Sequence, residues 1–340
     1  MKAAYYPEKN AIDYVDLAAP RPKKGEALIK VKYAGICGSD LHVYHGAHPT
    51  AQFPVIPGHE FVGALAELGE DACTDIKPGE IVVAQPFSSC GVCEACITGN
   101  DNVCRSLSLL GIHRNGCFAE YVAVPAKKMY RLPAGTDLQL AALAEPLAVA
   151  VHDVRRSGLK VGQNALIIGG GPIGLFIALV AQMAGAQVFI SEVSEFRLEF
   201  ARKMGFQTLN PTDQDFDRQV EEITKGKGFD VVFEVSGSKQ GIAAMTGLAK
   251  IAGTVMVVGM ASDKHPVDTM SIFLKQLTLS GVRIHSQEAF ASAVDILIGG
   301  RLNDKLNLLI SKTYALKDVK EAYDYVLSGS DYFKVLLEVK

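Results

Sequence analysis

The run Gly169-Gly170-Gly171-Pro172-Ile173-Gly174 constrains the fold of this chain more than any other stretch. It follows an apolar run at 164–169, which predicts a buried strand, and it opens a helical pattern at 172–184. An acid, Glu192, stands about 20 residues further on, at the end of the next predicted strand. In this context the G-x-G-x-x-G pattern predicts a dinucleotide-binding turn. The alternative is a glycine-rich turn with a structural role only.

Each part of this motif has a physical reason. Gly169 permits the turn, Gly171 lets a pyrophosphate approach the backbone, and Gly174 lets the helix pack closely against the strand. The amino end of the helix favours the phosphate charge. Glu192 would accept hydrogen bonds from the adenosine ribose hydroxyls and repel a 2′-phosphate, so NAD is favoured over NADP. Arg197 would stack on the adenine or tolerate a phosphate, unless it is a solvated helix-surface arginine.

The sequence around this motif alternates strands with helices, as expected for a doubly wound parallel sheet. Beyond the first strand and helix, further strands are predicted at 187–190, 229–235 and 254–259, with helices at 195–204, 213–225 and 239–251. A parallel sheet of this kind needs a helical crossover between successive strands. The predicted nucleotide-binding domain spans residues 149–284.

The chain before this domain has a different pattern. Short β-rich segments are predicted at 27–33, 60–68, 80–85 and 118–125, and then a helix from about 139 with Glu145 on or near its first turns. After 284 the chain turns helical, at 289–297 and 316–327, and ends on a strand at 335–339. We therefore predict a β-rich domain over residues 1–148, which a return segment over 285–340 completes.

Composition excludes several classes of function. The 340 residues carry a net charge of -3 without blocks of either sign, so we expect no nucleic-acid footprint and no membrane patch. Residues 161–191 lack any charge, but glycines interrupt this run, and buried strand and helix explain it better than a membrane span. Residues 1–17 have no continuous apolar core, so a cytoplasmic protein is expected.

Four closely spaced cysteines form the most specific pattern in the chain, Cys90-x2-Cys93-x2-Cys96-x7-Cys104. Four thiolates at such spacing match a closed tetrahedral structural zinc site, in a lobe at about 86–108. Chance clustering or a redox role is the alternative. The chain has seven cysteines, an odd number that favours thiols or metal ligands over disulfides.

A second candidate metal site combines Cys37 with the adjacent pair His59 and Glu60. Thiolate, imidazole and carboxylate are ligand types of catalytic zinc, which keeps one position open for water or substrate. Taken singly, Cys37 would be a small buried hydrophobe and His59 a hydrogen-bonded histidine. Adjacent residues on a regular strand point to opposite faces, so both His59 and Glu60 can bind metal only if Gly58 allows a bend.

Together these features resemble the zinc-containing medium-chain alcohol dehydrogenases, in their polyol dehydrogenase branch. The resemblance runs from end to end. It implies an α/β protein with a β-rich GroES-like catalytic domain and a doubly wound, parallel-sheet Rossmann domain that binds NAD, and a homodimer or homotetramer. It rests on residues 35–42, 58–60, 115–121, 144–147 and 169–174, together with the four cysteines.

The resemblance implies a role for individual residues. Cys37, His59 and Glu60 would bind the catalytic zinc, and Glu145 would compete with Glu60 for the metal. The zinc would turn the substrate hydroxyl into an alkoxide, whose hydride passes to NAD. Ser39 and His42 would relay the proton to solvent. The residues expected near the nicotinamide are Val258, Gly259, Met260, Val282 and Arg283.

The substrate is less defined by these patterns. Residues 195–205 and 115–121 resemble threonine dehydrogenases, but the loop at 43–49 is short and the chain has no tryptophan, unlike those enzymes. Sorbitol dehydrogenases usually place an aromatic residue where Val43 stands. Arg283, near His285, would clamp a carboxylate if it faces the substrate; the alternative is a surface or interface arginine.

We therefore predict oxidation of a secondary alcohol in a polyol or a sugar acid of aldonate type, with L-threonine 3-dehydrogenase or a 2,3-butanediol-type dehydrogenase as alternatives. A zinc-independent reductase of the same fold and a non-catalytic binding protein are the other classes.

Overall fold

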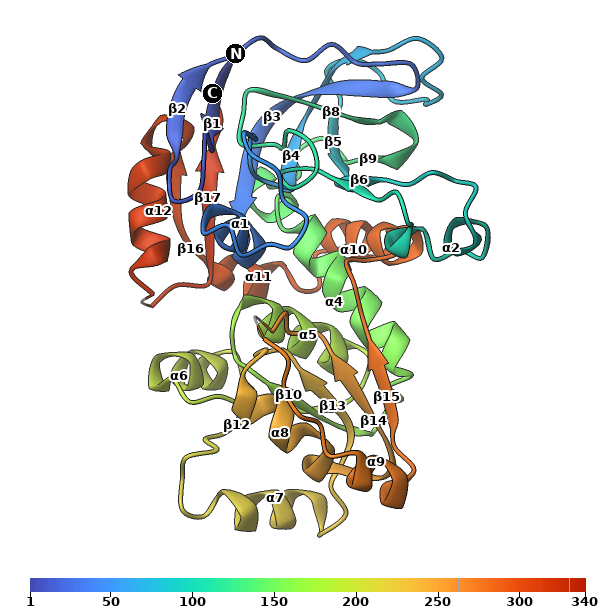
Figure 1. Ribbon diagram of the computed structural model, residues 1–340, viewed down its shortest axis with the longest axis vertical. Helices are drawn as coiled ribbons and strands as arrows, with labels where there is room; N and C mark the ends of the chain where they lie inside the picture. Colours follow the sequence, from blue (N-terminus) through green and yellow to red (C-terminus); the bar gives the residue numbers. More distant parts are fainter. Residues whose placement is uncertain (262, 330) are drawn as a thin grey trace. The chain divides into compact units, whose positions relative to one another are not determined.

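The computed structural model describes residues 1–261, 263–329 and 331–340. It divides into two compact units (Figure 1). The first combines Met1–Ala148 with Ser286–Lys340, and the second is Val149–His285.

A seven-stranded sheet forms the centre of the first unit. Its order is β16-β17-β3-β4-β5-β9, and β8 also pairs with β3. These strands are β3 (Glu26–Ile36), β4 (Glu60–Leu68), β5 (Ile81–Ala84), β8 (Tyr121–Pro125), β9 (Met129–Arg131), β16 (Ile310–Ala315) and β17 (Lys334–Glu338). The C-terminal β17 pairs antiparallel with the end of β3, with Val335 opposite Ile36. The chain end therefore lies beside the segment that leads into Cys37.

Smaller elements complete the first unit. Its remaining strands are β1 (Lys2–Tyr5), β2 (Asp13–Asp16), β6 (Phe87–Ser88) and β7 (Ser108–Leu109). Its helices are α1 (Gly38–Tyr44), α2 (Glu94–Ile97), α3 (Leu138–Ala141), α10 (Gln287–Gly299), α11 (Asn303–Leu309) and α12 (Val319–Leu327), with short 3-10 turns η1 (Asp101–Val103), η2 (Ala126–Lys128) and η3 (Leu316–Asp318). Helix α4 (Ala144–Ser157) runs from the first unit into the second.

The second unit is a parallel sheet in the order β12-β11-β10-β13-β14-β15. Its strands are β10 (Asn164–Ile168), β11 (Gln187–Ser191), β12 (Gln207–Leu209), β13 (Phe229–Glu234), β14 (Ala249–Val257) and β15 (Thr278–Gly281). Its helices are α5 (Pro172–Met183), α6 (Glu195–Lys203), α7 (Phe216–Thr224), α8 (Lys239–Leu248) and α9 (Thr269–Lys275). This strand order reverses between β10 and β13, and such a switch point is where open α/β sheets bind ligands. The predicted doubly wound sheet is confirmed.

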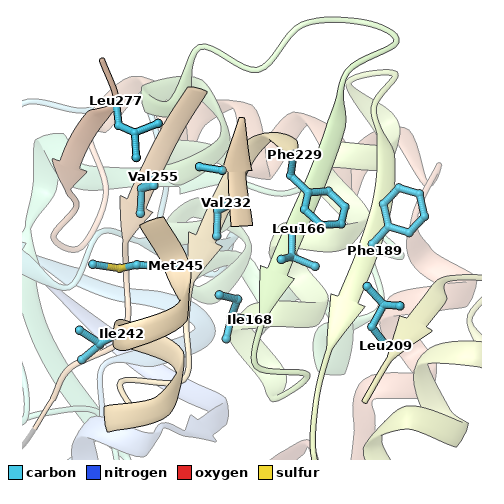
Figure 2. Packing of buried hydrophobic residues seen from close by; sticks show 11 residues of the cluster. Leu166, Ile168, Phe189, Leu209, Phe229, Val232, Ile242, Met245, Val255 and Leu277 are labelled. Atoms are coloured by element: carbon cyan, nitrogen blue, oxygen red, sulfur yellow. The ribbon is translucent and has the colours of Figure 1, made fainter. Parts of the chain in front are cut away.

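One apolar cluster packs α7, α8 and α9 of this unit against its sheet; Figure 2 shows its core. Leu166 and Val232 are fully buried on neighbouring strands, and the rings of Phe189 and Phe229 lie 5.6 Å apart. Met245 packs onto the same cluster from α8. This packing fixes the carboxyl ends of β10, β11 and β13, which carry the glycine turn and the acids discussed below.

Two sequence-based boundaries are wrong. The helix predicted at 239–251 ends at Leu248, because Ala249 pairs with Phe229 as the first residue of β14. The single helix predicted from 139 is two helices, α3 and α4. Pro146 explains the new start, since proline lacks an N–H and is tolerated in a first turn but not in a helix interior. The elements that were not predicted include β1, β2, β9, α1 and α2 in the first part of the chain, and β12, α9, α11 and β16 further on.

Candidate metal and dinucleotide sites

Cys37, His59 and Glu60 come together in the first unit. Each offers one ligand atom, and these atoms all lie within 4.8 Å of one another. Cys37 follows β3 and precedes α1, and Glu60 is the first residue of β4. Gly58 has φ +92°, the left-handed conformation that favours glycine, so the bend expected before the adjacent pair is confirmed. We call these three residues the cradle.

The cradle fits a zinc ion. His59 and Glu60 are buried, and Glu60 Oε1 has no hydrogen-bond partner among the described residues. A buried, unpaired carboxylate oxygen is costly unless a cation binds it. Gly35 lies opposite Glu60 on β3, and a Cβ there would stand only 2.2 Å from Glu60 Oε2. The glycine therefore leaves the space that the carboxylate occupies.

Asp40 binds the backbone on both sides of the cradle, a role that the sequence did not suggest. Its buried carboxylate accepts the N–H of Cys37 at 2.9 Å and that of Gly58 at 3.2 Å. Its Oδ1 lies 3.5 Å from His59 Nδ1, which leaves His59 Nε2 for a metal. Burial opposes a charged imidazole, but Asp40 and Cys37 raise the pKa of His59 well above its usual value. The only local signal was an acid three residues after Cys37.

Lys334 on β17 is a second residue that sequence reasoning missed. Its Nζ lies 2.5 Å from Glu60 Oε2 and donates to the carbonyl oxygen of Ile36 at 3.0 Å. Lys334 and Glu60 are both buried and 274 residues apart in sequence. Burial opposes the charged ammonium, but Glu60 and Cys37 raise the pKa of Lys334. No local pattern could have indicated this pair.

The other residues predicted for the catalytic site lie near the cradle. Ser39 Oγ is 3.4 Å from His59 Nε2. His42 lies one turn further along α1 and is half-buried; burial and the nearby His45 lower its pKa. Glu145, buried on α4, is not one of the three residues whose ligand atoms converge. Its charge is nevertheless close enough to oppose ionisation of Glu60.

The four cysteines also come together, with all sulfur atoms within 4.8 Å of one another. Sγ–Sγ distances are 3.5 Å for Cys93–Cys96, 3.8 Å for Cys93–Cys104 and 3.9 Å for Cys90–Cys96. A tetrahedron with Zn–S bonds of 2.3 Å has edges of about 3.8 Å. All four are free thiols, and backbone N–H groups lower the pKa of Cys93 to about 6. The four-cysteine lobe therefore fits a closed zinc site.

One buried lysine connects this lobe to the sheet. Lys128 lies 2.7 Å from Asp101, which belongs to the lobe, and its ammonium lies over the ring of Phe87, 4.5 Å from the ring centroid. Cation–π contacts of a desolvated lysine are stronger than those at the surface. Lys128 therefore anchors the lobe at Asp101, in addition to the contacts among its cysteines.

The glycine turn in the second unit has the geometry that its sequence predicts. Gly169 has φ +108° and follows β10, and Gly171 caps α5, whose first residues are Pro172 and Ile173. A Cβ at Gly174 would lie 2.0 Å from the carbonyl oxygen of Gly169, so only glycine fits there. The glycines of the turn therefore place no side chain of their own at the amino end of α5, where a phosphate would bind.

Glu192 follows β11 and lies against this turn. Its carboxylate accepts the N–H groups of Gly170 at 2.8 Å, Val193 at 2.7 Å and Ser194 at 3.0 Å. Arg197 Nη1 lies 3.6 Å from Glu192 Oε2 and is partly exposed. The acid is thus held in place by backbone donors, with a cation beside it.

Glu234, which was not predicted, organises the residues expected near the nicotinamide. Its main-chain oxygen accepts the N–H groups of Val258 and Gly259, and its carboxylate accepts the N–H and Oγ–H of Ser236. Met260 is exposed beyond this loop. Along the next strand, Val282 donates to the carbonyl of Val257, and Arg283 is exposed. The only signal for Glu234 was an acid at the end of a predicted strand.

Helices of the described residues are all too short or too polar to cross a membrane.

Known proteins resemble this chain over its whole length. The family described as "Alcohol dehydrogenase GroES-like domain" matches residues 23–134, and "Zinc-binding dehydrogenase" matches residues 172–298. The 2-dehydro-3-deoxy-L-galactonate 5-dehydrogenase of Pseudoalteromonas atlantica is 39% identical over 99% of this chain and 98% of that protein. An L-threonine 3-dehydrogenase of Streptomyces coelicolor is 37% identical over 92% of each.

A solved structure also resembles this chain over almost its whole length. The zinc-binding dehydrogenase from Sinorhizobium meliloti 1021, bound to NADP, superposes with a TM-score of 0.89 at 34% identity, over 99% of this chain and 98% of that one. The chain belongs to the zinc-binding medium-chain alcohol dehydrogenase family and is a zinc- and NAD(P)-dependent oxidoreductase of its polyol branch.

Proposed function

We propose that this enzyme oxidises a secondary hydroxyl of a sugar acid of aldonate type and transfers the hydride to NAD. The observation that carries the proposal is the 39% identity, over almost the entire chain, to an enzyme named for a sugar-acid substrate. In this proposal the first unit is the catalytic domain and the second is the NAD-binding domain.

Cys37, His59 and Glu60 would hold the catalytic zinc, which, when bound, acts as a Lewis acid that lowers the pKa of the substrate hydroxyl. Asp40, whose Oδ1 lies 3.5 Å from Nδ1 of His59, would orient the ring so that Nε2 faces the metal. Ser39, whose Oγ lies 3.4 Å from that Nε2, would take the hydroxyl proton. His42, on the same helix, would pass the proton to solvent, and its lowered pKa keeps the imidazole neutral and able to accept.

NAD is proposed over NADP because the carboxylate of Glu192 would oppose a 2′-phosphate beside the glycine turn. Arg197 is the residue that would offset this repulsion, and the NADP-bound structural relative makes the point worth testing. Comparing wild type with Glu192→Ala should show a large preference for NAD that falls in the variant. A wild type that reduces NADP as readily as NAD would reverse this assignment.

L-threonine is the second candidate substrate, because a threonine dehydrogenase is 37% identical to this chain. Threonine and an aldonate both carry a carboxylate, so a cation near the substrate suits either. The short loop at 43–49 and the absence of tryptophan favour the sugar acid. Arg283 is proposed as the carboxylate clamp.

Activity on a panel of substrates tests these assignments. NAD reduction is followed with aldonates, neutral polyols, L-threonine and 2,3-butanediol, in wild type, in Arg283→Ala and in the control Arg301→Ala, which removes another exposed arginine. The proposal expects turnover of aldonates and a rise in their KM in Arg283→Ala alone. Turnover of L-threonine without turnover of aldonates would replace the sugar-acid assignment, and an equal rise for neutral polyols would remove Arg283 as a clamp.

We also propose that the chain forms a homo-oligomer through the β15 edge of the second unit. β15 is the last strand of the sheet order, and an unpaired edge invites pairing with a second copy. The neighbouring helix α9 exposes Met270, Phe273 and Leu274. Phe273→Asp should lower the molar mass measured by light scattering; an unchanged mass, or a monomeric wild type, would contradict the proposal.

A further inference from the structure

We propose that Lys334 is a positioning residue of the metal site: its ammonium holds one oxygen of Glu60, so that this carboxylate can offer the metal only its other oxygen. The inference rests on the zinc-dependent activity proposed for the cradle. It is independent of which alcohol is the substrate.

The contact is built into the centre of the first unit. Lys334 Nζ lies 2.5 Å from Glu60 Oε2, and a second bond to the carbonyl of Ile36 directs the ammonium. β17, which carries Lys334, pairs with the end of β3, and the lysine is only 3% exposed, so its ammonium is enclosed beside Glu60. Gly35, directly across from Glu60, gives the carboxylate room beside the ammonium.

The two oxygens of Glu60 have different surroundings. Oε2 is bound by Lys334, whereas Oε1 has no hydrogen-bond partner among the described residues. The cradle counts Glu60 among its three ligands. A carboxylate that is held by one oxygen and is unpaired at the other is suited to bind a cation through the unpaired oxygen.

This asymmetry matters because a catalytic zinc must keep a position open for substrate. A carboxylate that closes on the metal with both oxygens would add a ligand atom and crowd that position. The charges around the cradle favour the same role. Asp40, Glu60 and Glu145 are buried near the cradle together with the Cys37 thiol, and Lys334 is the buried cation among them. Without it, the surplus negative charge would draw Glu60 toward the metal.

The alternative is that Lys334 only stabilises the fold. Buried ion pairs are weak evidence for stability, since desolvation of both charges offsets their attraction. A structural role predicts that loss of Lys334 weakens folding and metal binding together. The positioning role predicts the opposite for the metal, which should bind more tightly with one ligand atom more.

Cobalt substitution of the resting protein, without substrate or cofactor, separates these cases. The cradle metal is exchanged for Co(II) while the four-cysteine lobe keeps zinc, verified as one cobalt and one zinc per chain. Four-coordinate Co(II) absorbs visible light more strongly than five-coordinate Co(II). In Lys334→Met we expect weaker absorption and a zinc dissociation constant, measured by chelator competition, about tenfold lower, which is the scale of outer-shell effects.

Three further variants complete the test. Lys334→Met with Glu60→Gln should restore the strong absorption, because the freed carboxylate is gone. Lys334→Arg should bind zinc more weakly than wild type, since a guanidinium takes both carboxylate oxygens. Lys128→Met removes the other buried, ion-paired lysine, at the lobe, and should leave the cobalt spectrum unchanged.

If Lys334→Met does not fold, Lys334→Arg and the double variant decide the question. An unchanged spectrum in Lys334→Met, or weaker zinc binding in it, overturns the inference, and so does tighter binding in Lys334→Arg. A wild type that binds metal only in the four-cysteine lobe would instead defeat the proposed zinc-dependent function. A two-metal wild type with no effect at Lys334 would defeat this inference alone.

Discussion

The two clusters of metal-binding side chains in this enzyme differ in how the chain builds them. The four-cysteine lobe takes all its ligands from residues 90–104, and three of its four cysteines are at least partly exposed. The cradle takes its ligands from the ends of two strands, and buried charges surround it. We therefore expect the lobe to depend on its metal for its own folding, and the sheet to form the cradle without metal.

The difference extends to charge. In the lobe, backbone N–H groups lower the pKa of Cys90 and of Cys93 and so favour their thiolates. In the cradle, Asp40 holds the imidazole and Lys334 holds the carboxylate. A closed structural site thus needs only its ligands, and an open catalytic site also needs neighbours that keep each ligand in one orientation.

The largest effect should come from breaking the lobe. Cys93→Ser removes a ligand that also contacts the sulfurs of Cys96 and Cys104, and bound zinc supplies on the order of 10 kcal/mol of folding free energy to such loops. We expect one zinc per chain in place of two, and rapid proteolysis within residues 90–104. Metal analysis and limited proteolysis measure both; Cys73→Ser, an exposed cysteine outside the lobe, is the control. A lobe that resists proteolysis without zinc would show that it, like the cradle, forms without its metal.

Cys37→Ser should abolish activity while leaving the stability of the fold almost unchanged. Loss of a cradle ligand removes the Lewis acid, which contributes several kcal/mol, so turnover should fall by at least about 1,000-fold. The melting temperature and the zinc of the lobe should change little, because the strands that carry the cradle pair independently of it. Turnover, calorimetry and metal content are measured on the same preparation. A collapse in melting temperature would mean that the cradle, like the lobe, folds only with its metal.

The same contrast explains what the sequence could predict. The lobe and the glycine turn are local. Spacing indicated Cys90 to Cys104, and spacing together with the flanking strand and helix indicated Gly169 to Gly174. The ligand role of Glu60 was uncertain, because it depended on the backbone of Gly58. Asp40 was close in sequence, but its partners come from another strand. Lys334 could not be found, since only the pairing of β17 with β3 brings it to Glu60.

Asp40→Asn tests whether the cradle needs its supporting charge. The amide can still reach the N–H of Cys37 but cannot offer His59 a carboxylate, so zinc affinity at the cradle should fall about 10–100-fold. Chelator competition measures this change. Asp101→Asn is the matched control at the lobe, where the acid binds Lys128 and no metal-binding side chain. Equal losses of cradle zinc in both variants would show that the effect is not specific to the ring of His59.

The smallest effect concerns Asp153 on α4, another buried acid. It is fully buried, both its carboxylate oxygens lack hydrogen-bond partners among the described residues, and burial raises its pKa well above the usual 3.8. Because the folded state binds this proton more tightly than the unfolded state, Asp153 stabilises the fold below pH 3.8 and loses that contribution as pH rises toward its raised pKa. Burial raises the pKa of both acids, but Lys334 counteracts this at Glu60, whereas only burial acts on Asp153.

Asp153→Asn isolates this effect, because the amide has the same shape and does not ionise. The free energy of unfolding of wild type should fall relative to that of the variant as pH rises above about 4, by at most about 1.4 kcal/mol per pH unit for one proton. Urea unfolding across pH 5 to 9 measures the difference, with Glu199→Gln, an exposed acid, as the control. If the two unfolding curves run parallel, Asp153 is ionised in the fold, and a buried carboxylate in this enzyme does not need a cation to stay charged. The role of Lys334 at Glu60 would then be to orient the carboxylate and not to keep it charged.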